Sequence, residues 1–425
     1  MTAMRRATFW FIFATVLLDM LALGIIAPVF PTLVIQLQGG NEASAARFVG
    51  WFGTVWAVMQ FLFAPVLGAL SDRVGRRPVI LLSCLGLALD YAVMALAPTV
   101  AWLFLGRALS GITASSFATS YAYIADVTEP DERAQRFGLL GVAFGIGFIL
   151  GPAIGGLLGG IGVRAPFWAA GTLSLIGAAY GWFVLPESLP RERRAPFQWR
   201  RANPWGALGM LQAREALLGL ATVAFLYRLA HDALPSMFVL YGDYRYRWTT
   251  QTVGLALATV GVASMVVQGG VVGPAVKRLG EARALLTGLA CGAVAFTIYG
   301  LASSGAAFLL GIPVGSLFGL SYPSLQGLMT RRVGPDEQGR LQGALASLMG
   351  IAGVIAPVLY TQLFAAAIGR YRALGVPGAP FFLAALLLVA AIAIVRREIG
   401  STPVPLSAPS SPPVPLSQTE RGDAS

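Results

Sequence analysis

The sequence contains twelve apolar runs, separated by short polar segments. Each run holds about 20 residues or more, the length that an α-helix needs to cross a hydrocarbon layer of about 30 Å. With 56% hydrophobic and only 12% charged residues, the chain does not resemble a soluble protein. We therefore predict an all-α membrane protein with twelve transmembrane helices. The runs lie near residues 8–33, 50–70, 79–98, 101–125, 137–161, 165–185, 215–240, 252–274, 284–302, 305–329, 341–367 and 377–395.

Arginine residues mark one side of the membrane. Placing both chain ends in the cytoplasm puts 21 of the 30 Lys and Arg residues in cytoplasmic segments, in agreement with the known bias of short cytoplasmic loops. The net charge of +11 therefore reflects topology, and no nucleic-acid partner is expected. We expect a multi-pass protein of the cell's inner (plasma) membrane, surrounded by lipid, with both termini cytoplasmic.

The two halves of the chain repeat each other at an offset of 205 residues. Gly68 recurs as Gly273, and Pro152 recurs as Pro357. Two parallel six-helix repeats, with a binding site between them, are the architecture of many secondary transporters. The predicted segments are the first half (1–186), a cytoplasmic linker (187–214), the second half (215–396) and a disordered Pro- and Ser-rich tail (397–425).

Three motifs resemble those of a known family. The stretch 68–77 (Gly-x-Leu-Ser-Asp-Arg-x-Gly-Arg-Arg) resembles the loop 2–3 signature of the major facilitator superfamily, and 103–111 (Leu-x-x-x-Arg-x-x-Ser-Gly) resembles its second motif. The stretch 147–156 (Gly-x-x-x-Gly-Pro-x-x-Gly-Gly) is similar to the motif of proton-driven drug antiporters. Residues 17–19 and 89–91 also resemble the tetracycline efflux proteins.

The resemblance implies the major facilitator fold and the export of a small amphipathic compound in exchange for protons. It also implies that Asp72 latches the halves at the start of the eleventh helix and that Arg76 reaches Asp126. Two positions depart from the tetracycline efflux proteins: Ser264 stands where they carry a histidine, and Gly292 where they carry an aspartate. We therefore expect tetracycline to be a poor substrate. The expected gating residues are Gly68, Asp72, Arg73, Gly75, Arg76, Arg77 and Asp126.

Ionisable residues inside membrane helices are costly and mark candidate functional sites. Asp19 lies midway along the first run, where the family lines its cavity, and it can serve as a proton carrier or as a fixed counter-ion to Arg107. Asp90 serves either proton coupling or a structural pair between helices. Arg107 cannot lose its proton, so we expect it to hold carboxylates charged until a proton or substrate competes.

A second group of ionisable residues lies in the seventh run. Arg228 and Asp232 are four residues apart, so they share a helical face and can form an ion pair. His231 is the only histidine of the chain, and its side chain titrates near neutral pH. Either proton coupling or a packing and capping role fits it.

The expected substrate cavity combines amides, which can hydrogen-bond to a drug, with aromatic rings, which can instead face lipid. Its candidate residues are Phe30, Gln60, Tyr121, Phe225, Tyr322 and Gln326.

The fifth run carries a row of glycines with a proline beside it. A glycine every fourth residue leaves a smooth groove against which a neighbouring helix can pack closely. We interpret this groove as a sliding seam between the two halves, with ordinary helix packing as the alternative. The residues of the seam are Gly147, Gly151, Pro152, Gly155 and Gly156.

The predicted function is proton-coupled export by alternating access. Two alternatives remain open: a symporter that imports a metabolite, and a membrane sensor or scaffold that transports nothing. The sequence contains no Gly-x-x-x-x-Gly-Lys-Ser/Thr loop, so neither an ATPase nor another enzyme is expected. We expect no cofactor and no metal, and a monomer whose partners are a small-molecule substrate and protons.

Overall fold

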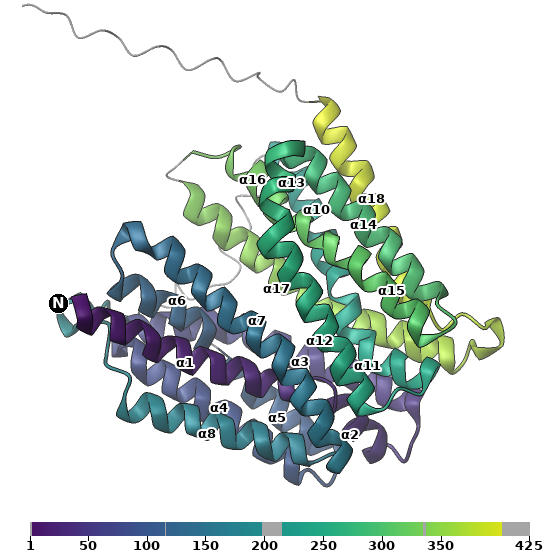
Figure 1. Ribbon diagram of the computed structural model, residues 1–425, viewed down its shortest axis with the longest axis horizontal. Coiled ribbons are helices and arrows are strands. Elements are labelled where there is room, and N and C mark those ends of the chain that lie inside the picture. Colours follow the sequence, from purple (N-terminus) through teal and green to yellow (C-terminus); the bar gives the residue numbers. More distant parts are fainter. Residues whose placement is uncertain (1, 115, 198–214, 335–336, 402–425) are drawn as a thin grey trace, which may run out of the picture.

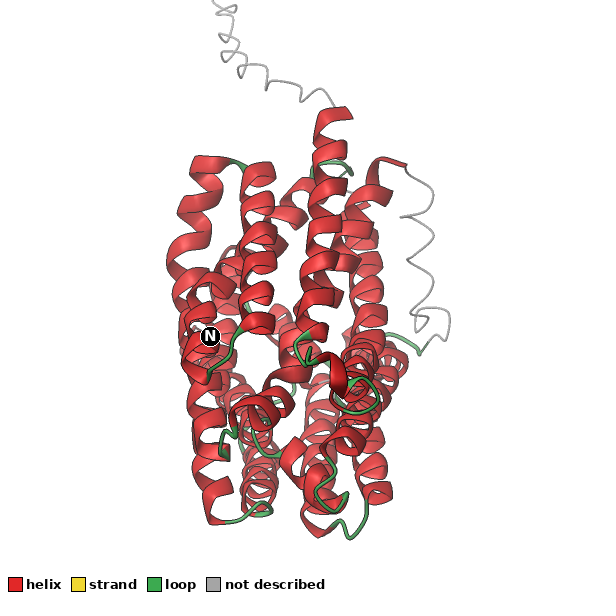
Figure 2. Cartoon of the chain, turned by 90° about the vertical axis from the view of Figure 1, so that its right-hand side faces the viewer, coloured by secondary structure: helices red, strands yellow, loops and turns green. Residues whose placement is uncertain are grey.

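The computed structural model describes residues 2–114, 116–197, 215–334 and 337–401, which form helices joined by short turns (Figures 1 and 2). Most of the predicted linker (198–214) and most of the predicted tail (402–425) lie outside these residues. The helices of the first half are α1 (Thr2–Ile26), α2 (Phe30–Leu37), α3 (Glu42–Val74), α4 (Arg76–Leu96), α5 (Val100–Thr113), α6 (Ser116–Val127), α7 (Pro130–Ile161) and α8 (Ala165–Phe183). Those of the second half are α10 (Glu215–His231), α11 (Ala233–Tyr246), α12 (Thr250–Val266), α13 (Val272–Leu279), α14 (Glu281–Leu301), α15 (Gly305–Ser316), α16 (Ser321–Thr330), α17 (Gln338–Ile368) and α18 (Ala379–Ser401).

Eleven helical stretches in the described residues are long and apolar enough to cross a membrane. α8 completes the predicted set of twelve: its 19 residues extend over roughly 28 Å, and it packs along α1 and α4. The predicted all-α fold is therefore confirmed. Several spans consist of two helices in sequence, such as α1 with α2, α5 with α6, and α10 with α11.

The breaks within the spans recur in the two halves. The first span breaks between Ile26 and Phe30, around Pro28, because proline cannot donate the helical hydrogen bond and restricts the residue before it. The seventh span breaks at Asp232, which lies 205 residues after Ala27. The eighth and tenth spans contain a π-helical turn (Val267–Val271) and a 3₁₀ turn (Leu317–Leu320). Such interruptions leave backbone groups and side chains facing a cavity rather than lipid.

Each half has its own core of buried apolar side chains. Phe238, Tyr241 and Phe381 belong to a large aromatic cluster in the second half. Two smaller clusters, around Phe52 and around Tyr123, lie in the first half. Contact between the halves runs mainly through the helix pairs α3–α17 and α7–α12.

Among the described residues, the helices of the two halves meet at one of their two ends and are apart at the other. We call the end with residues 71–77, 191–194 and 331–332 the arginine-rich end, and the end with residues 38–41, 162–164 and 247–249 the opposite end. At the opposite end Arg247 forms an ion pair with Glu42 at 2.7 Å. Farther from that end, at the contact between α3 and α17, Thr54 Oγ1 donates a hydrogen bond to the Val354 carbonyl at 2.8 Å.

The helices of the two halves diverge towards the arginine-rich end (Figure 1). Along the facing helices, several glycines near this end would place a Cβ within 4 Å of no non-local atom, whereas Gly156 and Gly254 at the α7–α12 contact would place it against the other half. The open positions include Gly68, Gly138, Gly141, Gly273 and Gly339. The structure is therefore closed at the opposite end and separated at the arginine-rich end.

Candidate functional site

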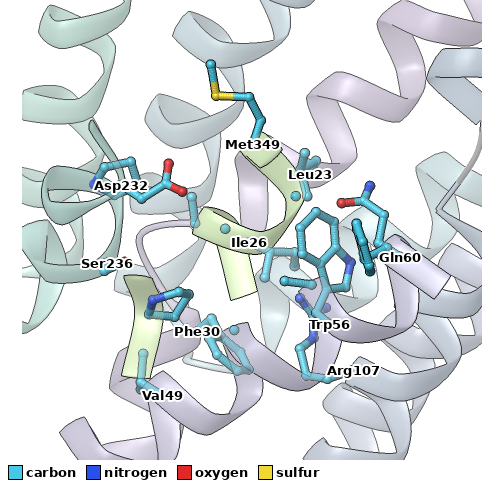
Figure 3. Close-up of a pocket in the computed structure, with 18 of the residues that line it drawn as sticks. Leu23, Ile26, Phe30, Val49, Trp56, Gln60, Arg107, Asp232, Ser236 and Met349 are labelled. Atoms are coloured by element: carbon cyan, nitrogen blue, oxygen red, sulfur yellow. The ribbon is translucent and has the colours of Figure 1, made fainter. Parts of the chain in front are cut away.

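A cavity of about 990 Å³ lies between the two halves. Its walls are mostly apolar, and its charged lining residues are Arg107, Arg228 and Asp232. Figure 3 shows Phe30, Trp56, Gln60 and Arg107 close together, with Asp232 on the other side of the cavity. A large apolar cavity with a few polar groups is what a small-molecule site requires.

Arg107 of α5 forms a buried ion pair with Asp90 of α4. The distance from Nη2 to Oδ2 is 2.5 Å, and the two side chains are 14% and 0% exposed. Gly106 makes this approach possible, because a Cβ at that position would lie 2.5 Å from Asp90 Oδ1. Phe30 lies 5.3 Å from the guanidinium carbon, a cation–π contact at the cavity wall. Asp90 thus forms the interhelical pair that the sequence offered as one of its two roles.

The pair is not fully satisfied by hydrogen bonds. Within the described residues, Asp90 Oδ1, Arg107 Nε and the Tyr91 hydroxyl are buried without a hydrogen-bond partner. Buried polar atoms nearly always form hydrogen bonds, so three such atoms without a partner in one part of the structure are unusual. Tyr91 lines the cavity together with Arg107.

The ionisable residues of the seventh span also form a cluster. Arg228 Nε donates to Asp232 Oδ2 at 3.0 Å, as the spacing of four predicts, and both side chains line the cavity. His231 Nδ1 lies 3.4 Å from Asp232 Oδ1. The imidazole packs between Tyr227 and Phe318, and it is not part of the cavity lining.

Asp19 does not line the cavity, contrary to expectation. It shares a helical face with Leu23 and Ile26, which do line it, but it lies one turn nearer the arginine-rich end. Cys84 of α4 covers it there, with Sγ 3.6 Å from Asp19 Oδ1, and the aspartate is 1% exposed. Arg107 forms its ion pair with Asp90 instead.

Of the six expected cavity residues, Phe30 and Gln60 line the cavity and the other four do not. The other four lie nearer the arginine-rich end, where they contact neighbours within their own half. Tyr121 packs on Phe137, Phe225 packs against the core of the second half, Tyr322 stacks on Tyr227, and Gln326 donates to Tyr322 and Gln342.

Trp56 and Ser236 line the cavity but were not expected from the sequence. Trp56 lies four residues before Gln60 on the same face of α3, so helical spacing from that glutamine points to it. Gln60 also donates weakly, at 3.5 Å, to the carbonyl of Ala114, where the fourth span breaks. Ser236 follows the break at Asp232, which the sequence did not reveal.

The charged turn forms a network at the arginine-rich end. Arg76 Nε donates to Asp126 Oδ2 at 3.1 Å, as the resemblance implies, and Nη1 donates to Asp72 at 2.5 Å. Gly75 joins α3 to α4 with a φ of 113°, which favours glycine. Glu187, which the sequence did not single out, accepts from the backbone N–H groups of Arg76 at 2.8 Å and of Arg77 at 3.3 Å.

The other gating candidates have separate positions. Arg77 donates to the carbonyls of Gly181 and Trp182 at the end of α8. Arg73 is exposed, and Gly68 has open space around it. Asp72 is half exposed and contacts Arg76, so its contact with the start of α17 stays a prediction for another conformation.

The glycine groove of the fifth span, α7, faces two neighbours. Gly147, Gly151 and Gly155 pack on α1, which belongs to the same half. Gly156 and the carbonyl of Pro152 pack on α12, across the boundary between the halves. The seam between the halves thus consists of Gly156 and not of Gly147, Gly151 and Gly155. Gly159 and Gly160 extend it, since their nearest atoms belong to Thr250 and Gln251 of α12.

Gly254 supplies the α12 side of this seam, which suggests a test. A Cβ there would lie 3.0 Å from Gly156 Cα and still closer to the Pro152 carbonyl. We expect Gly254→Val to disfavour closure of the opposite end by about 1–3 kcal/mol, a shift of roughly 5- to 150-fold in the two-state balance. We then expect stronger labelling of a cysteine introduced at Val49 by an impermeant maleimide added at the opposite end. The variants are made in a background without Cys84 and Cys291.

The matched control is Gly273→Val, since that glycine has open space around it. Equal labelling of the Gly254→Val variant and its parent would contradict the assignment of this seam.

The two departures from the tetracycline efflux proteins have different surroundings. Gly292 is enclosed, because a Cβ there would lie 2.7 Å from the ring of Phe318 and 2.8 Å from Leu388. An aspartate does not fit at that position without repacking. Ser264 is half-buried in α12.

Comparisons with known proteins agree with the geometry. The family model described as Major Facilitator Superfamily matches residues 12–357. The tetracycline resistance protein, class C, of Escherichia coli is 39% identical over 377 residues, which cover 88% of this chain and 94% of that protein. The class G protein of Vibrio anguillarum is 36% identical and covers 91% and 96%. The crystal structure of the human organic anion transporter MFSD10 (TETRAN) is 27% identical with a TM-score of 0.67, covering 92% and 99%. The resemblance drawn from the sequence motifs is confirmed, and the chain belongs to the major facilitator superfamily.

Proposed function

We propose that this protein is a secondary transporter that exports a small amphipathic compound, such as a drug, in exchange for protons by alternating access. The observation that carries the proposal is the cavity between the halves, which is closed at the opposite end and contains a buried Arg107–Asp90 pair in its wall. Matched relatives bear the name of tetracycline resistance proteins, which supports export of a drug-like compound. Protons and the substrate are its partners, and the chain needs no cofactor and acts as a monomer rather than as an enzyme.

The orientation follows from the charges. The arginine-rich end faces the cytoplasm, with both termini on that side of the inner membrane. The cavity then opens to the cytoplasm, where an exporter collects its substrate. The aliphatic and aromatic lining favours an amphipathic substrate, because burial of apolar surface drives its binding.

The movement consists of tilting one half (1–186) against the other (215–396), with residues 187–214 as their connection. Separate cores allow each half to move as a unit, and small residues at the α7–α12 contact allow the backbones to slide. The pairs α3–α17 and α7–α12 would part at the opposite end while closing at the arginine-rich end.

A proton-flux screen in inverted membrane vesicles tests the function. A panel of cationic, anionic and zwitterionic amphiphiles is added to energised vesicles, and the internal pH is followed by fluorescence. Export by antiport predicts proton release driven by one or more of these compounds. Symport predicts proton flux in the opposite sense, and a sensor or scaffold predicts none. Tetracycline is expected to give a small response, because Ser264 and Gly292 replace the usual ionisable residues.

Asp72 is expected to latch the arginine-rich end once the cavity faces outward. Unpaired backbone N–H groups at the start of α17 favour a nearby carboxylate by about 0.3–1 kcal/mol, and by up to ~2 kcal/mol when it is partly buried. Asp72→Asn should therefore lower transport and shift the population towards the conformation described above. Cysteine pairs that bridge α3 and α17 at this end should cross-link less than in the parent. The control is Lys277→Gln at the equivalent position of the second half; equal cross-linking and transport for Asp72→Asn would exclude the latch.

A further inference from the structure

The Arg228–Asp232 pair of the cavity wall continues to His231, which is outside the cavity lining. Asp232 divides its two oxygens between these neighbours. Oδ2 accepts a hydrogen bond from Arg228 Nε at 3.0 Å, and Oδ1 lies 3.4 Å from His231 Nδ1. The side chain of His231 is 45% exposed, so its imidazole is open to proton exchange. One carboxylate thus connects an arginine of the cavity wall to a titratable imidazole.

The charge of this cluster depends on three side chains among the described residues: Arg228, Asp232 and His231. The ring that the 3₁₀ turn of the tenth span places on the imidazole is uncharged Phe318. α18 also packs on α10, but its Glu398 lies beside Gly219, about 18 Å along the helix from His231. The other titratable groups within reach are phenols, which stay neutral near pH 7. They belong to Tyr227 of α10, Tyr322 of α16 and Tyr360 of α17.

A proton on His231 changes the net charge around the cavity. With a neutral imidazole the formal charges cancel, since Arg107 pairs with Asp90 and Arg228 pairs with Asp232. With a protonated imidazole one positive charge is in excess, next to the carboxylate that Figure 3 shows across the cavity from Trp56. The mostly apolar walls screen this charge less than water would. A positively charged group in the cavity is therefore bound less tightly when His231 carries a proton.

We propose that His231 is a proton-operated switch of the Arg228–Asp232 pair, so that a proton on the imidazole and a cationic group in the cavity exclude each other. This inference rests on the proposed export function and states how protons regulate its site. The histidine acts through Asp232 as a positioning residue and needs no contact with the substrate. Since such coupling is reciprocal, a bound cation weakens proton binding at His231 by the factor by which the proton weakens cation binding.

The test uses the fact that His231 is the only histidine of the chain. The full-length protein, purified through a tag without histidine and labelled with ¹⁵N-histidine, is placed in lipid vesicles. Solid-state NMR then gives the pH midpoint of imidazole protonation, with and without the permanent cation ethidium. We expect ethidium to lower this midpoint, and its affinity to be roughly tenfold weaker below the midpoint than above it. His231→Gln should abolish this pH dependence while it retains the affinity of the parent at high pH.

Two variants of the cluster test the role of the pair. Asp232→Asn should lower the midpoint by about one pH unit, because the imidazolium loses its anionic neighbour, and Arg228→Gln should raise it by about as much. The control is Asp243→Asn, outside the cavity lining, which should leave the midpoint unchanged.

An unchanged midpoint in either cluster variant would overturn the switch. A midpoint that ethidium does not lower, or failure of the parent to bind ethidium, would overturn it too. Proton release from energised vesicles of the parent, measured with the panel of amphiphiles, tests the export function separately, because the midpoints and affinities require no transport.

Discussion

Replacing Arg107 with glutamine is expected to lower the free energy of unfolding by about 3–5 kcal/mol and to abolish transport. The variant leaves Asp90, which is 0% exposed, as a buried carboxylate without its cation. One of its oxygens already lacks a hydrogen-bond partner among the described residues, and Ser110, the other side chain that hydrogen-bonds to this carboxylate, carries no charge. Thermal unfolding of the purified protein in detergent measures the first effect, and proton-driven uptake into inverted vesicles measures the second.

Two further variants test whether the lost stability comes from the uncompensated charge of Asp90. Adding Asp90→Asn to Arg107→Gln removes the uncompensated charge, so most of the lost stability should return while transport stays absent. Arg228→Gln is the matched arginine control: its side chain is 40% exposed, so its pair with Asp232 is screened and its loss should cost no more than about 1 kcal/mol. If Arg107→Gln unfolds at the temperature of the parent, the pair does not stabilise the fold as described.

Asp19→Asn has the second large expected effect, which is the loss of proton-driven accumulation without loss of folding. Asp19 is 1% exposed and lies within a membrane span, where an ionisable side chain marks a candidate functional site. Asparagine has nearly the same shape but cannot exchange a proton. We therefore expect accumulation in inverted vesicles to fall to the background level, while downhill movement of substrate continues.

The control for this prediction is Asp243→Asn, another aspartate of a membrane span that is not part of the cavity lining. It should retain proton-driven accumulation. Full accumulation by the Asp19→Asn variant would remove Asp19 from the coupling mechanism, and the Asp90–Arg107 pair would then be the remaining candidate in the first half.

Hydropathy predicted the spans well because it depends on local composition. Each apolar run must be helical in lipid to satisfy its own backbone, wherever the neighbouring helices lie. The predicted run 8–33 carries no break, yet Pro28 explains the one before α2, since a proline interrupts a helix regardless of its partners. The ion pair of Arg228 with Asp232 could be predicted for a similar reason, as a spacing of four within one helix fixes their separation.

Contacts between helices were predictable only where a motif specified both partners, as for Arg76 and Asp126. The sequence contains two carboxylates, Asp19 and Asp90, at depths from which either could meet Arg107, and hydropathy does not distinguish them. The choice of Asp90 depends on the rotation of α4 and on Gly106, which lets α4 and α5 approach closely.

Only the tertiary structure decided which residues line the cavity and which seam joins the halves. Tyr121, Phe225, Tyr322 and Gln326 have suitable side chains, yet they lie outside the lining because the cavity depends on small differences in helix tilt and depth. Hydropathy adds up residue by residue along one helix, whereas a cavity is the space left after many helices have packed. The number of the spans can therefore be inferred from the chain alone, but the wall formed by Tyr91, Trp56 and Arg107 cannot.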